Sequence, residues 1–193
     1  MLILGSRLIN TPIMGLQTGT RLASTKLPVV DPSNLKILAY EVDGALLSEK
    51  PSFIRIADVR ELSDVGLIID SNDEFIGVND VIKIKEIYEL GFNLIDMNVT
   101  DESKRRLGKV YNYSLDTDNF IIQQLNVRQG IFKSLSDSEL LINRSQIIEI
   151  NNNEIIVKTT AQKLKPLSKT SKMTYMNPFR SQSPQIENTD TRL

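Results

Sequence analysis

The sequence predicts a mainly β protein made of two tandem small β-barrels, with short helical turns and a disordered C-terminal tail. Three observations support this fold class. An internal repeat of about 85 residues is too long for a solenoid unit and suits a small self-contained barrel. Each copy divides into five or six short apolar runs separated by turn residues. Aromatic residues are only 6% of the chain and Trp is absent, so the core must rest on Ile, Leu and Val, whose β-branched members favour strands.

The repeat is clearest in the segment 30–42, which is matched 85 positions later by 115–127. Farther on, Phe53-Ile54 returns as Leu141-Ile142, now with an offset of 88. The second copy therefore carries three extra residues between the matched blocks, and we expect them in the loop at 128–137. The repeat predicts one barrel over 1–75, a second over 76–160 and a tail over 161–193.

In the first copy, the polar turn at 15–22 predicts a hairpin with Gly19 at positive φ. The sequence Asp31-Pro32-Ser33-Asn34 favours a type I turn between two strands. The elements expected in order are strands at 26–30 and 35–42, a strand containing 53–54, a helical turn at 57–59, and a closing hairpin that turns at 63–66 into a strand at 67–69.

The second copy repeats this order after an acidic linker at 73–80 and a short helix that ends at Gly91, a good residue to follow a helix C-terminus. Its elements are a hairpin over 97–110, a corner at 116–119, a strand at 140–142, a helical turn at 144–147, a turn at 151–154 and a strand at 155–157. The residues expected in the core are Leu35, Ile37, Leu38, Val42, Ile54, Val59, Leu62, Ile68, Phe120, Ile122, Leu125, Ile142, Ile147, Ile150 and Ile156.

The second copy contains an apolar run, a polar turn, Leu107-Gly108-Lys109-Val110, a strand, an Asp-containing turn and an alternating strand. This order resembles the PRC-barrel family, which includes the cytoplasmic domain of the photosynthetic reaction centre H subunit and the C-terminal domain of the 16S rRNA maturation factor. The first copy departs from the pattern at Leu22-Ala23-Ser24-Thr25. The resemblance covers roughly residues 5–158 and implies an interaction module, because its motifs are structural and carry no catalytic signature.

The composition argues against an enzyme. The chain has no Cys and no His, which removes thiolate nucleophiles, the commonest general acid-base and the commonest metal ligands. Carboxylates at Asp101-Glu102, Asp116 with Asp118, and Asp70 with Asp73-Glu74 lack the spacing of a calcium loop and suit solvated turns. We therefore expect no catalytic residue, no metal and no cofactor.

Basic residues form two candidate contact sites for a partner. Lys104, Arg105 and Arg106, with Lys109 nearby, are the dense basic run of the folded part and could contact RNA phosphate; the alternative is a solvated turn. From Thr159 onward the chain carries a charge of +4 against −5 for the rest. The tail residues that combine apolar anchors with charge are Met173, Tyr175, Met176, Phe179 and Arg180, which suits a segment that folds on a partner as well as a solubilising tail.

The sequence therefore predicts a non-enzymatic protein-binding or scaffolding module whose partner is another protein. The alternative is an RNA- or ribosome-associated maturation factor, against which the acidic body argues. No run of about 18 apolar residues could span a membrane, and no charged segment precedes a hydrophobic core at the N-terminus, so a cytoplasmic location is expected. The sequence leaves the oligomeric state open.

Overall fold

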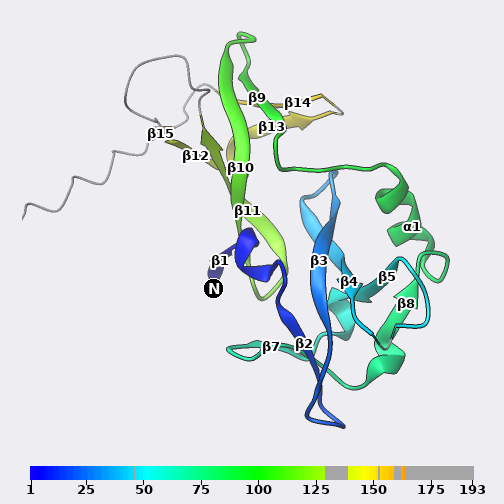
Figure 1. The fold of residues 1–193 in the computed structure, drawn as a ribbon. Coiled ribbons are helices and arrows are strands. Elements are labelled where there is room, and N and C mark those ends of the chain that lie inside the picture. The colour runs from blue at the N-terminus through cyan, green and yellow to red at the C-terminus, as the bar shows by residue number, and fades with distance from the viewer. Residues whose placement is uncertain (46, 129–138, 152, 159–161, 164–193) are drawn as a thin grey trace, which may run out of the picture.

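A computed structural model describes residues 1–45, 47–128, 139–151, 153–158 and 162–163. It is mostly β-strand, with one α-helix and four short 3-10 turns in the described part (Figure 1). The first copy contains β1 (Leu2–Leu4), η1 (Gly5–Leu8), β2 (Pro12–Gly15), β3 (Arg21–Asp31), β4 (Lys36–Asp43), β5 (Ser52–Arg55), η2 (Ile56–Asp58), β6 (Glu61–Ser63), β7 (Gly66–Ile69), η3 (Asn72–Glu74) and β8 (Phe75–Gly77). The second contains α1 (Ile82–Glu89), β9 (Asn98–Asp101), β10 (Arg106–Asp116), β11 (Ile121–Arg128), β12 (Glu139–Asn143), η4 (Arg144–Gln146), β13 (Ile147–Ile150), β14 (Glu154–Val157) and β15 (Gln162–Lys163).

The internal repeat is reproduced in the strand pairing. β3 pairs with β4 as β10 pairs with β11, and the parallel pair β2–β7 recurs as β9–β14. Val42 lies opposite Ser52, and its equivalent Val127 lies opposite Leu140. The offset thus changes from 85 to 88 between β11 and β12, where the three extra residues were predicted; the loop itself lies outside the described residues.

Backbone conformation repeats as well. Gly19 has φ of 65°, as predicted, and its equivalent Lys104 has φ of 60°. Leu35 (φ 56°) and Phe120 (φ 53°) also occupy the left-handed region at equivalent positions, as do Asn10 (φ 59°) and Asp96 (φ 69°). Left-handed residues other than Gly are uncommon, so their recurrence shows that the two copies share one local architecture.

The prediction of two separate barrels is not confirmed. The strands form one continuous sheet in the order β13-β14-β9-β10-β11-β4-β3-β2-β7-β6, which does not close on itself. The copies meet at β4 and β11, where the Ile37 N–H donates to Phe120 O and the Ile122 N–H donates to Leu35 O, both at 2.9 Å. These two bonds are equivalents under the repeat, so the copies are related by an approximate two-fold axis. Sequence reasoning treated each copy as closed and missed this pairing.

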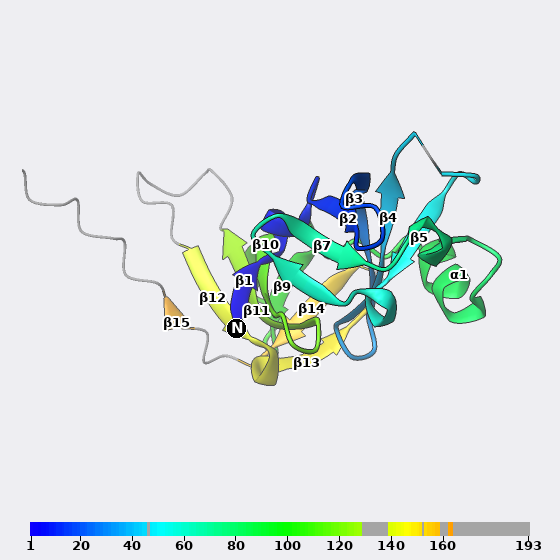
Figure 2. The same ribbon diagram turned by 90° about the horizontal axis from the view of Figure 1, so that it is seen from below.

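The leading segment of each copy, which is β1 with η1 in the first and α1 with the loop to Ile95 in the second, packs on the other copy. We call this the exchange of leading segments. β1 of the first copy pairs with β10 of the second. α1, which takes the place of β1 in the second copy, packs on the first copy, where Ile84 and Ile87 are buried with Val29 and Phe53. Figures 1 and 2 both show α1 beside β5, on the outer side of the first copy. The predicted helix is confirmed, with Gly91 at φ 59° after its C-terminus.

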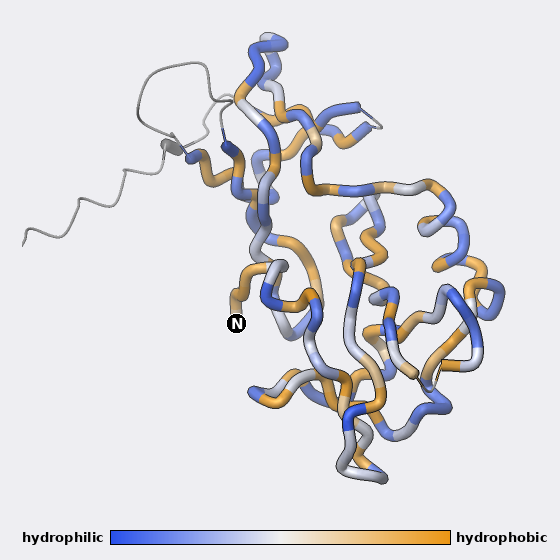
Figure 3. Tube along the Cα trace, in the orientation of Figure 1, coloured by the Kyte–Doolittle hydropathy of each residue, from blue (hydrophilic) through white to orange (hydrophobic). Residues whose placement is uncertain are grey.

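The main hydrophobic core is shared by both copies and includes the buried Ile37, Ile54, Ile122 and Ile142. In Figure 3 apolar and polar residues are mixed along the strands, as expected where only one face of a strand turns toward a core. The core prediction is right for Leu35, Ile37, Val42, Ile54, Phe120, Ile122, Leu125 and Ile142, which are all buried. It is wrong for Leu38, Val59, Leu62, Ile68, Ile147, Ile150 and Ile156, which are only partly buried.

Candidate functional site

Strand β13 forms one end of the sheet and pairs only with β14 in the described part of the chain. An edge strand presents unpaired N–H and C=O groups that can accept another strand. Three of its four side chains are apolar: Ile148 is 48% exposed, and Ile147 and Ile150 are half-buried, whereas Glu149 is exposed. β13 is therefore an open and mainly apolar edge.

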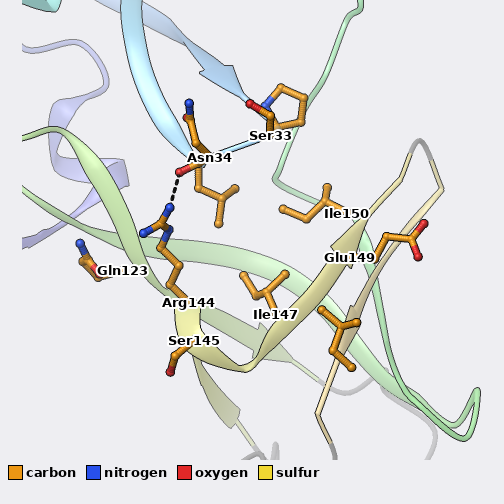
Figure 4. Close-up of a pocket in the computed structure, with 11 residues that line it drawn as sticks. Ser33, Asn34, Gln123, Arg144, Ser145, Ile147, Glu149 and Ile150 are labelled. Carbon is orange, nitrogen blue, oxygen red and sulfur yellow. Dashed lines mark hydrogen bonds between the residues drawn. The ribbon is translucent and has the colours of Figure 1, made fainter.

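A cavity of about 400 Å³ lies between β13 and the β3–β4 turn of the first copy. We call this cavity the edge groove. All four residues of β13 line one side, and Pro32 to Leu35 line the other. Figure 4 shows Ile147 and Ile150 projecting toward the turn, whereas Glu149 points away from it. The β13 side of the groove is thus mainly apolar, and Ser33 and Asn34 add polar groups on the side of the turn.

The turn that forms the far wall is held by its own hydrogen bonds. Asp31 Oδ1 accepts from the Ser33 N–H at 3.0 Å and from the Ser33 hydroxyl at 2.6 Å. Asn34 Oδ1 accepts from the Lys36 N–H at 2.9 Å. Burial opposes ionisation of Asp31, but the bonds from Ser33 prevail and hold its pKa below the ordinary value. The wall is therefore a fixed loop with a charged Asp beneath it.

Arg144 of η4 closes one end of the groove by donating to Asn34 O at 3.0 Å (Figure 4). The η4 turn that carries Arg144 is held by the Asn143 N–H, which donates to Gln146 Oε1 at 2.8 Å. The second copy thus reaches across to the first at this point. Because both walls are fixed, an added strand could enter the groove without a large rearrangement.

The equivalent edge of the first copy carries an ion pair immediately before β6. Arg60, the counterpart of Ile148, binds Asp70 through two bonds, of which Nε to Oδ1 is 2.9 Å. The hydrogen bond from Arg60 lowers the pKa of Asp70, so the pair stays charged. Lys158 stands where Asp70 would recur. Charged residues on edge strands discourage pairing with another chain, and β13 lacks this protection at Ile148.

The predicted basic residues Lys104, Arg105, Arg106 and Lys109 lie together on the β9–β10 hairpin and are all exposed, in the hydrophilic tip seen in Figure 3. Arg105 Nε donates to Asp101 Oδ2 at 2.9 Å, and the Arg105 N–H donates to Asp101 Oδ1. These bonds, that from the Arg105 N–H foremost, lower the pKa of the buried Asp101. Arg106 Nη2 donates to Asn98 Oδ1 at 3.0 Å. Arg105 therefore holds its own turn, which sequence reasoning did not foresee.

The remaining predictions concern the tail, metal ligands and membrane spans. Met173, Tyr175, Met176, Phe179 and Arg180 lie outside the described residues. Within the described residues, no group of three acidic side chains could hold a metal ion. No helix in the described part of the chain is long and apolar enough to cross a bilayer. The edge groove was not predicted; the signal for it was the Ile147-Ile148 pair before Glu149, of which we assigned Ile147 to the core and gave Ile148 no role.

No protein-family model and no curated protein sequence matches this chain.

Proposed function

We propose that this protein is a non-enzymatic protein-binding module, and that the edge groove receives an extended segment of the partner as an added strand beside β13. The observation that carries the proposal is the contrast between the two edges. Equivalent strands end the sheet on both sides, but only the β6 side has an ion pair at this position. An extended peptide gains main-chain hydrogen bonds from the edge, and its alternate side chains gain specificity from the groove.

The partner segment is expected to alternate apolar and polar residues, because successive side chains of a strand point to opposite faces. Its apolar side chains would contact Ile147 and Ile150, whereas small polar groups could reach Ser33 on the other wall. We further propose that the repeated unit is related to the PRC family, in which this kind of module serves for binding. The shared order of hairpin, strand, helical turn and closing hairpin supports that relation.

The test uses a displayed library of random 12-residue peptides selected on the full chain. Selected peptides should be rich in alternating β-branched or aromatic residues. N-methylation of every second backbone amide should abolish binding in one register and leave it in the other, because only alternate amides face the neighbouring strand. If methylation has the same effect on binding in both registers, strand addition is wrong.

Two variants locate the binding. Ile148→Arg places the first copy's residue on the second edge and should weaken peptide binding about tenfold or more. Val65→Arg is the matched control, because Val65 is an exposed apolar residue, 61% exposed, on the other closing hairpin. Equal loss in both variants would show that the peptides bind elsewhere.

A second candidate is RNA binding through the β9–β10 hairpin, favoured by the joint exposure of Lys104, Arg106 and Lys109. Phosphate contacts make affinity fall with salt concentration. If this candidate is right, replacing these three residues by Gln should reduce both the affinity for single-stranded RNA and the slope of its salt dependence. An unchanged slope would exclude the hairpin as the contact.

A further inference from the structure

A second cavity, of about 460 Å³, lies where the two copies meet. We call it the seam cavity. Two of its walls are the long strands β3, at Leu27 to Val30, and β10, at Tyr111 to Tyr113. The leading segments of both copies complete it, with Gly5, Ser6 and Ile9 from one and Gly91 to Ile95 from the other. The cavity is therefore a product of the exchange of leading segments and would not exist in one copy alone.

Charge is absent from this cavity. Among the described residues that line it, none carries an ionisable acid or base at neutral pH. Its polar side chains already have partners: Asn112 Nδ2 donates to Ser6 Oγ at 2.9 Å, and Asn93 Oδ1 accepts from the Ile95 N–H at 3.1 Å. A charged ligand group would lose hydration here and find no charged side chain among the lining residues; Arg128 and Glu41 lie next to Tyr111 and Tyr88 but do not line the cavity. The lining thus selects for a neutral molecule.

Aromatic rings supply much of the remaining surface, from Tyr88, Phe92, Tyr111 and Tyr113. The Tyr88 hydroxyl is 3.5 Å from Glu41 Oε2, so its polar end has a partner on the first copy. Burial raises the pKa of Tyr113 to about 12, so this phenol stays neutral. Aromatic rings attract other rings in offset or edge-to-face arrangements, which favours a flat ligand over a flexible chain.

We propose that the seam cavity is a binding site for a neutral aromatic small molecule held between the two copies. Its volume lies within the range of small-molecule sites, which is about 300–1,000 Å³. The site is separate from the edge groove, since the two cavities share no lining residue: Leu27 to Val30 line the seam cavity, and Pro32 to Leu35 line the edge groove. This inference does not depend on the proposed protein binding.

The experiment compares two dyes with the same ring system, N-phenyl-1-naphthylamine, which is neutral, and 8-anilinonaphthalene-1-sulfonate, which is anionic. The full chain should bind the neutral dye saturably, one molecule per chain, and at least about tenfold more tightly than the anionic dye. The chain has no Trp, and three of its five Tyr line the cavity, so Tyr fluorescence should be quenched in step with dye binding.

The matched variants are Leu27→Asp and Leu16→Asp. Leu27 lines the cavity and is 57% exposed, whereas Leu16 is 66% exposed and lies on the β2–β3 hairpin. Leu27→Asp should weaken neutral dye binding about tenfold, and Leu16→Asp should leave it unchanged. Both substitutions are at exposed positions, so both chains should fold, which circular dichroism checks.

Methyl NMR of the wild-type chain gives a readout that does not rely on a variant. The neutral dye should shift the signals of Ile9, Ile87 and Ile95, which line the cavity from three different segments. Equal affinity for the two dyes, unchanged binding by Leu27→Asp, or shifts confined to other methyl groups would each overturn the proposal.

Discussion

The two copies have the same backbone but differ at their surfaces. They share strand pairing, the turn after the long hairpin strand and three pairs of left-handed residues. They differ at the outer edge, where Arg60 faces Asp70 in one copy and Ile148 stands in the other. They also differ in the leading segment, which is a strand in one copy and a helix in the other. The structure that the two copies have in common builds the shared core, whereas the parts in which they differ border the two cavities.

The largest effect that tests this comparison is expected in the core. Ile37 and Ile122 are equivalent, both have 0% exposure, and each donates one of the two main-chain hydrogen bonds described above between β4 and β11. Ile37→Ala and Ile122→Ala should each lower the free energy of unfolding by about 2–5 kcal/mol, in a single transition. Urea denaturation followed by circular dichroism measures this. Two separate transitions, with only one affected by each substitution, would mean that the copies do not share a core.

A smaller effect is expected at the left-handed turn position. Gly19→Lys gives the first copy the residue of the second and should cost about 1–2 kcal/mol, because a side chain at positive φ is strained. The cost should come from backbone strain alone, since a Cβ at Gly19 would meet nothing within 4 Å. Lys104→Gly should be stabilising by less than about 1 kcal/mol. Thermal denaturation compares them, and a destabilised Lys104→Gly chain would show that the Lys104 side chain contributes more than its strain.

Acid should act on both copies through the equivalent turns. Bonds from Ser33 lower the pKa of Asp31 despite its burial, and bonds from Asn119 lower the pKa of Asp116. A lowered pKa in the folded state stabilises the protein above the unfolded value of about 3.9, and this stability is lost as pH falls through the folded value. Asp31→Asn should therefore lose less Tm than the wild type between about pH 5 and pH 2. If Tm falls equally with pH in Asp31→Asn and in the wild type, ionisation of Asp31 does not contribute to the acid sensitivity of the protein.

The smallest effect on stability is expected at the edges. Ile148→Arg and Arg60→Ile exchange the edge residues and should each change the free energy of unfolding by no more than about 0.5 kcal/mol, because both positions are exposed. The same urea titration measures them. A loss of several kcal/mol in Ile148→Arg would show that Ile148 is needed for folding and would remove the contrast on which the edge groove rests.

Sequence reasoning found the features that are local and repeated. The matched runs predicted the strands, Gly19 and Gly91 marked their turns, and the change of offset located the extra residues. The closing strands were placed with the wrong face inward: Leu67, Ile69, Ile155 and Val157 are buried rather than Ile68 and Ile156. These strands read Leu-Ile-Ile and Ile-Ile-Val, so no polar residue marks the outer face, and only the pairing with β2 and β9 decides it.

The two cavities could not be predicted in the same way. The edge groove depends on the β3–β4 turn of one copy lying against β13 of the other, and the seam cavity depends on exchanged leading segments. Both cavities are formed by residues of the first copy and residues of the second copy, which are far apart in the sequence. A repeat shows that two units are alike but contains no information about how they face each other, so two closed barrels and one shared sheet fit the same pattern.

The pairing of β4 with β11 also has a consequence for synthesis on the ribosome. Lys36 emerges 85 residues before Ile121, the residue that lies opposite it in the sheet. At a usual elongation rate this separation corresponds to roughly 4 to 17 s. Throughout that interval the start of β4 in the nascent first copy has no partner strand, because Ile121 has not been made. The site of α1 is uncovered for a shorter time, until Glu89 has emerged. Slower translation of the second copy should therefore lengthen the period in which this chain is open to aggregation and to chaperones.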